Sequence, residues 1–332
     1  MVRNALEISR LRSARWGGRS TIVGYWAAAA LFLGMLGACT AAPPPKEFDG
    51  KTAFGYLQTQ VNFGPRIPGT PPHERMAAWL DSMFRARADS VIIQSWNHTT
   101  ASGTVLPLHN VIARFNPGAT RRVLFMAHWD TRPHADRDPH NPTQPVPGAN
   151  DGASGVAVLL GMADALKAHQ PAIGVDLLCE DGEDYGDFEK EKDDVLIGAR
   201  YFAQHLPPGP TYLFAALLDM VGDRELQIKE EGQSLLAAPE VVDLVWRQAR
   251  ELGYAQYFIP SPGETLTDDH VELHKVGIRA IDVVDFQYGP PVPGKPGGSW
   301  WHTTEDTIDK VSAQSLQVVG DVMMAVIRRT GA

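Results

Sequence analysis

The sequence predicts an α/β fold of three layers, α/β/α, with a central mixed, mostly parallel sheet in a single domain. Strand-like apolar runs alternate with helical patterns along most of the chain, which is typical of a sheet covered by helices on both faces. One run, 123–127, is apolar without interruption, as expected of a strand that is buried on both sides. The chain is 44% hydrophobic and 21% charged, which is ordinary for a globular protein of this kind.

The first 50 residues differ from the rest of the chain. Arginines among residues 10–19 precede an apolar stretch, 22–36, and small residues then lead to Cys39. A basic region, a short apolar segment and small residues are typical of a secretory signal peptide. The Leu-Gly-Ala that precedes Cys39 resembles a bacterial lipobox, whose cysteine is lipid-modified after cleavage. We therefore expect a signal peptide at 1–38, a lipidated Cys39 with a flexible tether at 39–50, and a folded domain at 51–332.

A protein processed in this way belongs to the cell envelope, at the periplasmic face of the outer membrane in a Gram-negative bacterium. The lipid on Cys39 would be its membrane attachment. The alternative is an uncleaved anchor, because the apolar run is near the shortest length that spans a bilayer.

Cleavage would remove five arginines and one glutamate from 30 basic and 39 acidic residues, which leaves a net charge of −13. That charge argues against nucleic acid as a partner. Cys179, in an apolar run, is expected to be a small buried side chain.

From residue 51 onward, helical and strand-like patterns follow one another. Two helical segments flank a turn-rich stretch at 64–69, and the second has amphipathic spacing over 74–83. Strands are expected at 91–96, 110–115, 123–127, 175–179, 212–218 and 278–284. Helices are expected at 153–169, 240–252 and 312–329. Two long connections rich in proline and glycine, 131–149 and 287–299, are candidate pocket walls.

Residues that can bind a metal or move a proton follow the carboxyl ends of three predicted strands. His128 follows the run at 123–127, Glu183 and Asp184 follow the strand at 175–179, and Asp219 follows the strand at 212–218. Ligands of open α/β sheets bind at this edge. Four acids within residues 180–184 would repel one another unless a cation compensates them. Alone, they would indicate an acidic surface turn.

Three further residues complete a set that favours zinc. Asp151 lies in a glycine-rich turn that opens a helix, His302 lies far downstream, and Asp130 is placed to orient the ring of His128. Zinc binds imidazole nitrogen and carboxylate oxygen, and a catalytic site leaves one position open. Of two adjacent acids, one would hold the cation and the other would move a proton. As isolated features, Asp151 would be a helix N-cap, and Asp306 would be either a helix cap or the partner of His302.

Other chemistries have weaker support. Residues 152–155 lack the Gly-x-Ser-x-Gly spacing of a nucleophile elbow. The chain has no Cys-x-x-Cys or P-loop pattern, so neither a structural zinc site of that type nor nucleotide hydrolysis is supported.

Five ordered motifs resemble the zinc aminopeptidase and glutaminyl cyclase superfamily. They are Ala-His-Trp-Asp at 127–130, Asn-Asp-Gly-Ala-Ser-Gly at 150–155, Gly-Glu-Asp at 182–184, Leu-Asp-Met at 218–220 and Trp-His-Thr-Thr at 301–304. The resemblance extends from about Gly64 to the C-terminus. It implies a zinc-exopeptidase-like catalytic domain at 51–332 that acts on peptide or protein N-termini.

The resemblance also implies roles for individual residues. Those that match the metal ligands of two-zinc aminopeptidases are His128, Asp151, Asp184, Asp219 and His302, with Asp151 bridging. The cyclases hold one zinc ion, through the positions of Asp151, Asp184 and His302, and use the position of Asp219 in a proton network. Glu183 matches the general base. One zinc ion is therefore expected, with a second at His128 and Asp219 as the alternative.

Two features favour the cyclase branch. Asp268 begins an Asp-Asp-His segment that resembles the cyclase segment whose first Asp joins the proton network, and Trp301 resembles the Trp of the cyclase pocket wall. As structural features only, Asp268 would cap the next segment and Trp301 would pack. Animal cyclases have Glu at the position of Asp184 and a Trp in the following loop, where Phe188 would substitute for it.

The prediction is therefore a zinc-dependent glutaminyl-peptide cyclotransferase, which converts N-terminal Gln to pyroglutamate with release of ammonia. The alternative is a two-zinc aminopeptidase, which would use the same ligands and the same base. A catalytically silent zinc-binding lipoprotein is a third, minor possibility, because silent relatives usually lose the base or a ligand and this chain has both.

Overall fold

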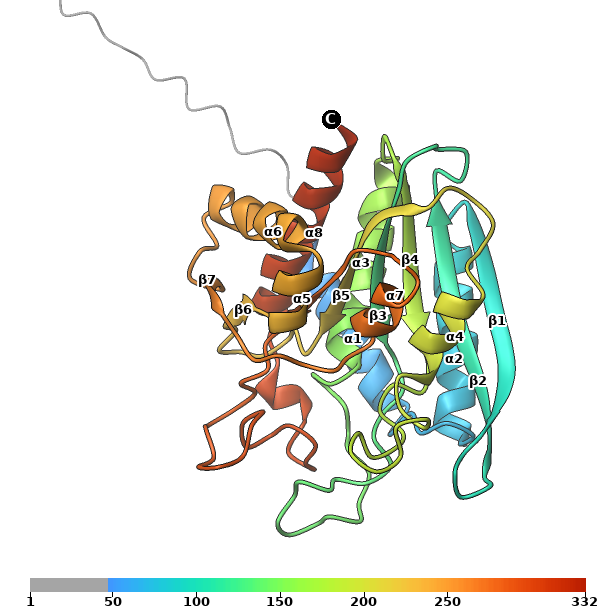
Figure 1. Ribbon diagram of the computed structural model, residues 1–332, viewed down its shortest axis with the longest axis vertical. Coiled ribbons are helices and arrows are strands. Elements are labelled where there is room, and N and C mark those ends of the chain that lie inside the picture. Colours follow the sequence, from blue (N-terminus) through green and yellow to red (C-terminus); the bar gives the residue numbers. More distant parts are fainter. Residues whose placement is uncertain (1–46) are drawn as a thin grey trace, which may run out of the picture. The chain divides into compact units, whose positions relative to one another are not determined.

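A six-stranded mixed sheet forms the centre of the computed structural model, which describes residues 47–332 (Figure 1). The strand order is β1-β2-β4-β3-β5-β8. The strands are β1 (Ser90–Thr99), β2 (Val105–Phe115), β3 (Arg122–His128), β4 (Gly174–Glu180), β5 (Tyr212–Asp219) and β8 (Ala280–Val284). The pairs β4–β3, β3–β5 and β5–β8 are parallel, whereas β1–β2 and β2–β4 are antiparallel. The predicted mixed, mostly parallel sheet is confirmed.

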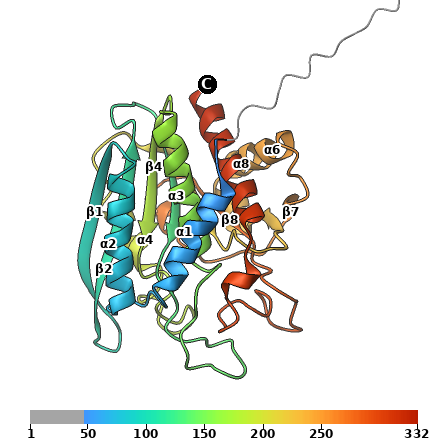
Figure 2. The same ribbon diagram turned by 180° about the vertical axis from the view of Figure 1, so that it is seen from behind.

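Helices cover both faces of this sheet, as Figures 1 and 2 show. One face carries α1 (Gly50–Asn62), α2 (Pro71–Arg85), α3 (Ala153–Ala168) and α8 (Ala313–Gly331). The other carries α4 (Ile197–Gln204) and α7 (His270–His274). Next to β8 lie α5 (Gly232–Ala237) and α6 (Pro239–Glu251), with a small sheet of β6 (Ile228–Glu230) and β7 (Phe258–Pro262). A 3₁₀ turn, η1, spans Ile308–Lys310.

The alternation of side chains along β3 explains the three layers. Phe125 and Ala127 belong to the core cluster under α1, α3 and α8, whereas Leu124 and Met126 belong to the cluster under α4. Every residue of β3 is buried. Because burial of one such aliphatic or aromatic side chain contributes about 1.5–3 kcal/mol, an apolar run without polar interruption is most stable in the middle of a covered sheet.

The folded domain begins three residues before the predicted boundary at residue 51. Phe48 is 2% exposed, and its ring lies so close to Gly161 in α3 and Gly320 in α8 that neither position has room for a Cβ. Asp49 is the N-cap of α1, and its carboxylate accepts a hydrogen bond from the backbone N–H of Lys51. The predicted signal peptide, Cys39 and most of the predicted tether lie outside the described residues. Within 47–332, no helix has the length and apolarity needed to cross a membrane.

The sequence patterns predict the long elements and miss the short ones. They do not predict α4, α5, α7, β6 or β7, which contain three to eight residues each. Such elements are too short to show a helical or strand period. The patterns also place the start of β2 at residue 110, five residues later than the structure does, because Pro107 and His109 interrupt the apolar alternation.

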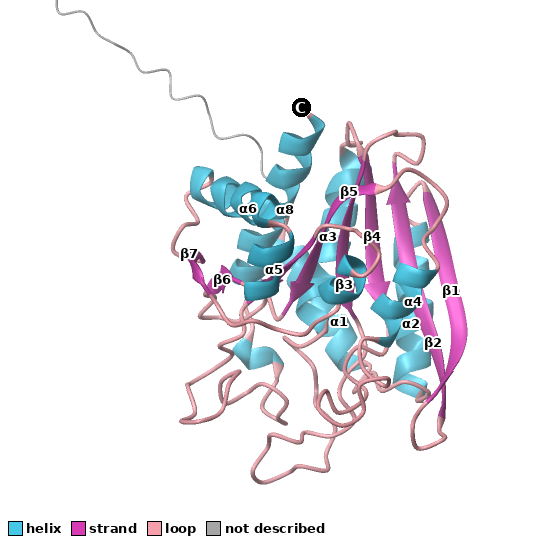
Figure 3. Cartoon of the chain, viewed as in Figure 1, coloured by secondary structure: helices cyan, strands magenta, loops and turns pink. Residues whose placement is uncertain are grey.

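The loops after β3, β4 and β5 gather beyond the carboxyl ends of these parallel strands (Figure 3). The connection from β3 to α3 spans 129–152, and the connection from β4 to α4 spans 181–196. The loop between β8 and η1 lies at the same end of the sheet (Figure 1). The fold thus brings together site residues that are up to 174 positions apart in the sequence, from His128 to His302.

Candidate active site

His128, the last residue of β3, lies at the centre of a buried polar cluster. Its Nε2 atom is 3.0 Å from Asp151 Oδ1 and 3.2 Å from Asp219 Oδ1. Neither ring nitrogen has a hydrogen-bond partner of good geometry, and neither does Asp219 Oδ1, although His128 is 1% exposed. Burying such groups without partners is costly. An imidazole and two carboxylates that converge without hydrogen-bonding one another form a donor set that fits a metal ion.

A second group shares Asp151 with the first. His302 Nε2 lies 3.7 Å from Asp151 Oδ2 and 3.5 Å from Asp184 Oδ1. All three side chains are buried, and their ligand atoms lie within 4.8 Å of one another. Ligand atoms about 2.0–2.2 Å from one zinc ion are roughly 3.3–3.6 Å apart in a tetrahedron. The spacing of Asp151, Asp184 and His302 therefore fits one zinc ion.

A tight turn presents Asp151 to the cluster. Gly152 has a φ of +86°, and a Cβ at this position would lie 2.8 Å from the carbonyl oxygen of Asp130 and 3.0 Å from Cε1 of His128. Only glycine combines this conformation with such a close approach at little cost. The N-cap residue of α3 is Gly152 rather than Asp151, so the carboxylate of Asp151 is not used as a helix cap.

The carboxylate of Asp306 binds the backbone of the same turn. Its Oδ1 atom accepts hydrogen bonds from the backbone N–H of Asn150, at 2.8 Å, and from the hydroxyl of Tyr288, at 2.8 Å. Its Oδ2 atom accepts a bond from the backbone N–H of Asp151, at 3.1 Å. Asp306 is therefore neither the partner of His302 nor a helix cap, the two roles that the sequence suggests, but the acceptor that fixes the backbone around Asp151.

Asp130 ties the end of β3 to the acidic turn after β4. Its carboxylate accepts hydrogen bonds from the backbone N–H groups of Glu183, at 3.1 Å, and Asp184, at 3.2 Å. Its Oδ1 atom also lies 3.4 Å from Nδ1 of His128.

Burial raises the pKa of Glu183 well above its ordinary value, although the nearby His128 opposes the shift. A buried carboxyl group with a raised pKa is suited to take up and return a proton near neutral pH.

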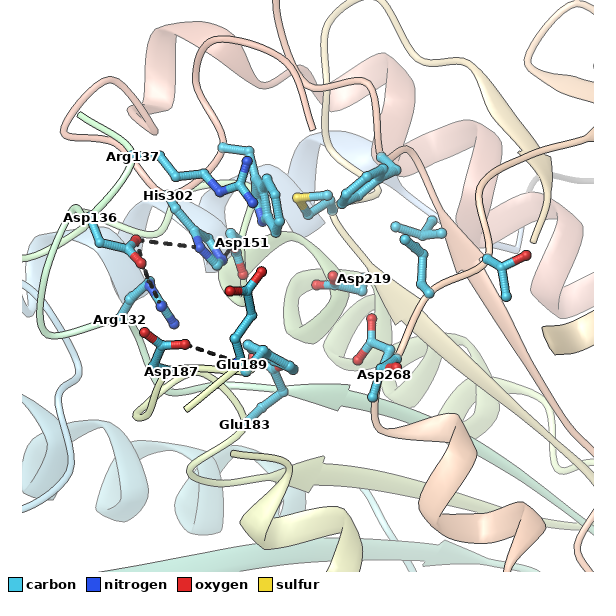
Figure 4. A pocket seen from close by; sticks show the side chains of 18 of the residues that line it. Arg132, Asp136, Arg137, Asp151, Glu183, Asp187, Glu189, Asp219, Asp268 and His302 are labelled. Carbon is cyan, nitrogen blue, oxygen red and sulfur yellow. Dashed lines mark hydrogen bonds and ion pairs between the residues drawn. The ribbon is translucent and has the colours of Figure 1, made fainter. Parts of the chain in front are cut away.

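Arg132 and Asp136 belong to the site, although the sequence motifs do not indicate them. Arg132 Nη1 donates to Asp184 Oδ1 at 2.7 Å, and its Nε and Nη2 donate to the two oxygens of Asp136 at 2.9 Å each. Asp136 Oδ1 in turn lies 3.7 Å from Nδ1 of His302. Figure 4 shows Arg132, Asp136 and His302 side by side at the edge of the pocket. Arg132 and Asp136 lie in a connection that shows no periodic pattern. The one signal that the sequence offers for them is that this connection follows the motif at 127–130.

Asp268 contributes a further acid from the segment before α7. It is 9% exposed, and burial raises its pKa to about 8, with a further contribution from the negative charge of Asp219. Its Oδ1 atom accepts a hydrogen bond from the backbone N–H of Asp269, and the Asp269 side chain makes no cap bond to α7. Behind it, Asp269 and Glu180 are fully buried, and burial also raises the pKa of Glu180 to about 8. Burial thus raises the pKa of carboxyl groups both in the pocket and behind it.

Part of this cluster lines a pocket of about 420 Å³ (Figure 4). Asp151, Glu183, Asp219, Asp268 and His302 all line it. Its walls include Trp301 and Phe188, the two aromatic residues expected from the sequence, and Leu266, Val284 and Phe286, which the sequence does not indicate. The connection 131–149 contributes to the wall as predicted. The connection 287–299 also lines a pocket, but it is a smaller neighbouring cavity of about 190 Å³.

Comparison with known proteins identifies the family of the chain. The family model described as Peptidase family M28 matches residues 110–327, which include all five site motifs. The chain belongs to peptidase family M28. Its fold, its ordered motifs and its convergent carboxylates and histidines agree with this membership.

Two solved structures illustrate the range of its neighbours. A Zn-dependent exopeptidase from Parabacteroides distasonis is 36% identical, with a TM-score of 0.81 over 85% of this chain and 98% of that one. A glutaminyl cyclase from Bacteroides thetaiotaomicron, solved with N-acetylhistamine, is 34% identical, with a TM-score of 0.80 and the same coverage.

Curated relatives show the same two activities. Aminopeptidase YwaD of Bacillus subtilis is 28% identical over 217 residues, which are 62% of this chain and 40% of that protein. The glutaminyl-peptide cyclotransferase-like protein of Bos taurus is 27% identical over 270 residues, 73% of this chain and 66% of that protein. The chain thus spans two fifths to about two thirds of the length of these relatives. Together with the metal-binding groups, the family supports a zinc-dependent enzyme.

Proposed function

We propose that the chain is a glutaminyl-peptide cyclotransferase that converts the N-terminal Gln of peptides or proteins to pyroglutamate and releases ammonia. The observation that carries this proposal is the position of Asp268, a buried acid that lines the same pocket as Glu183 and Asp219, where burial and the charge of Asp219 raise its pKa to about 8. The reaction needs no nucleophilic side chain, and it needs groups that pass one proton from an amine to a leaving ammonia. The likeness to solved glutaminyl cyclases at 34–36% identity gives further support.

Asp151, Asp184 and His302 would hold one zinc ion, whose Lewis acidity would polarise the γ-amide carbonyl of the substrate. These residues fit the ion, since their ligand atoms converge and are buried. His128 and Asp219 remain beside Asp151 as the donors of a second ion, but the proposed reaction does not require one.

Glu183 would carry the proton. The α-amine nitrogen attacks the γ-carbonyl carbon, and the new C–N bond closes the five-membered ring. Glu183 takes the proton that the amine loses and delivers it to the departing amide nitrogen, which leaves as ammonia when the old C–N bond breaks. Each turnover returns Glu183 to its starting state. A raised pKa, which burial produces here, suits a group that must both accept and donate.

Other pocket residues would place the substrate. Asp219 and Asp268 would accept hydrogen bonds from the α-amine and support the proton shuttle, as the resemblance implies. Trp301 and Phe188 would pack against the glutamine side chain. Because the pocket holds the amine and the carbonyl in the reacting orientation, the peptide loses its conformational entropy on binding rather than in the chemical step, which lowers the barrier.

A two-zinc aminopeptidase is the second candidate, and one observation favours it specifically. His128 Nε2 and Asp219 Oδ1 face Asp151 with no hydrogen-bond partner, as the ligands of a second metal ion would. In that case Glu183 would deprotonate a water molecule that attacks the first peptide bond. The same pocket would serve both reactions.

Mass spectrometry of two peptides, one beginning with Gln and one with Leu, separates these candidates. The cyclase predicts loss of ammonia from the Gln peptide and no change in the Leu peptide. Release of free leucine without loss of ammonia would contradict the cyclase and support the aminopeptidase. No change in the mass of either peptide would support a zinc-binding protein without activity.

We also propose that the enzyme is an exported lipoprotein attached through Cys39, so that exported proteins with an N-terminal Gln are its natural substrates. The lipobox-like sequence supports this. When the expressing bacterium is fed labelled palmitate, the wild-type protein should carry the label and Cys39→Ser should not. An unlabelled wild type, or equal label in Cys39→Ser, would contradict the lipid attachment.

A further inference from the structure

We propose that the segment 132–138, which follows β3, is a clamp that positions Asp184 and His302 for the metal ion. The inference rests on the proposed metal site, but it concerns residues that no motif includes. The two ligands come from different loops, one after β4 and the other between β8 and η1. Side chains and one backbone group of this short segment contact both loops.

Arg132 holds the first ligand. It is 6% exposed, and its Nη1 atom donates to Asp184 Oδ1 at 2.7 Å and to the carbonyl oxygen of Gly186 at 2.9 Å. The contacts restrain both the carboxylate of Asp184 and the backbone beyond it. Hydrogen bonds between ionised groups are roughly twice as strong as those between neutral groups. Arg132 also compensates one negative charge in a cluster rich in carboxylates.

Asp136 joins Arg132 to the second ligand. Its two oxygens accept from Nε and Nη2 of Arg132 in a bidentate pair, and Oδ1 lies 3.7 Å from Nδ1 of His302. Nδ1 is the ring nitrogen that points away from Asp151 and Asp184. Histidines that bind a metal generally present their other ring nitrogen to a carboxylate or carbonyl, which fixes the ring and raises its basicity.

The next two residues of the clamp stabilise an unfavourable backbone at His302. This residue has a φ of +56°, which is uncommon for a residue with a Cβ and costs about 1–2 kcal/mol. The backbone N–H of Arg137 donates to the carbonyl oxygen of His302 at 3.3 Å. Asp138 accepts hydrogen bonds from both the backbone N–H and the hydroxyl of Thr304. The clamp therefore binds the backbone on the C-terminal side of His302 as well as its ring.

The clamp also reaches the pocket wall. The guanidinium of Arg137 lies 3.9 Å from the ring centroid of Trp301, and its Nη1 donates to the carbonyl oxygen of Pro296 at 3.1 Å. Cation–π contacts of this type contribute about 0.5–2 kcal/mol. Four of the seven residues at 132–138 thus contact the loops that carry the two ligands and the aromatic wall. Three of these contacts end directly on residues of the site, at Asp184, His302 and Trp301.

The test measures zinc affinity rather than activity. Zinc binding to the full-length protein is followed by competition with a chromophoric chelator. For Asp136→Asn we expect an affinity about 10–100-fold weaker than that of the wild type, the usual effect of removing such a partner. The matched control is Asp243→Asn. Like Asp136, Asp243 is an exposed carboxylate paired with an arginine four positions away, but it lies on α6 and outside the pocket. This substitution should leave the affinity unchanged.

A double-mutant cycle with Arg132→Gln tests whether the two residues act together. Because Arg132 holds Asp136 in place, Asp136→Asn should weaken zinc binding less in the Arg132→Gln background than in the wild type. Wild-type affinity in Asp136→Asn, in a protein that binds zinc tightly, would overturn the clamp and leave the proposed function intact. Failure of the wild-type protein to bind zinc would overturn both. Equal effects of Asp136→Asn and Asp243→Asn would also overturn the clamp.

Discussion

Asp306→Asn tests the link between the fold and the metal-binding turn. The Asp306 carboxyl is fully buried, and burial and the neighbouring Asp151 raise its pKa to about 7. At pH 8 the group is therefore ionised and accepts three hydrogen bonds, from Asn150, Asp151 and Tyr288. An asparagine has nearly the same shape, so the substitution changes the hydrogen bonding without leaving a cavity.

The magnitude follows from those three bonds. An asparagine oxygen in the place of Oδ1 retains the bonds from Asn150 and Tyr288, but its NH₂ group then faces the backbone N–H of Asp151. One hydrogen bond is lost and one buried donor is left unsatisfied, which costs about 1–3 kcal/mol. In the zinc-loaded protein the loss of stability should be larger, because Asp151, whose backbone N–H loses its acceptor, is itself a predicted zinc ligand.

Urea unfolding at pH 8 measures both effects, once with the metal chelated and once with zinc present. The control is Asp309→Asn, an exposed position in η1 three residues further on, which should change the unfolding free energy by less than about 0.5 kcal/mol. If Asp306→Asn in the chelated protein is as stable as that control, the carboxylate does not hold the turn and the account of how Asp151 is positioned is refuted.

Two further predictions concern buried positions around the site. Asp285 is 1% exposed, and burial, with the charge of Asp223 adding to it, raises its pKa to about 7. The folded state therefore binds this proton more tightly than the unfolded state, so the unfolding free energy falls as pH rises from about 4 to 7. Asp285→Asn, which has no such proton, should lack this part of the pH dependence, and equal slopes of unfolding free energy against pH in the two proteins would contradict this. Gly152→Ala should destabilise the protein by about 2–5 kcal/mol, since left-handed strain adds to close contacts with Asp130 and His128. A Gly118→Ala control, with open space around it, should change the thermal midpoint very little, and an equally small change in Gly152→Ala would contradict the strain.

The residues of the site that carry chemistry can be recognised from the sequence because they belong to short motifs at strand ends. Asp151, Glu183, Asp184 and Asp219 each follow an apolar run or lie in a distinctive turn, and His302 belongs to the Trp-His-Thr-Thr motif. The fold brings the five together at one edge of the sheet. The long strands are likewise visible, because seven or more consecutive residues show a clear pattern of burial.

The supporting residues are hidden from the sequence for a physical reason. Arg132 and Asp136 lie in a connection with no period, and they act through contacts with residues 52 and 166 positions away. Asp306 shows the same difficulty, because its partners are backbone groups about 155 positions distant. Nothing local distinguishes such a carboxylate from a helix cap. Phe286 belongs to the pocket wall only because β8 ends beside it.

The central claim is that Glu183 moves the proton beside a metal ion that Asp151, Asp184 and His302 hold. Its most direct test is the turnover of a Gln-initiated peptide by Glu183→Gln, with the zinc content of the same sample measured in parallel. We expect a fall in kcat of about 10²–10⁴-fold, the usual contribution of a general acid–base group, with the zinc content unchanged. Wild-type turnover, or loss of the zinc together with activity, would contradict it.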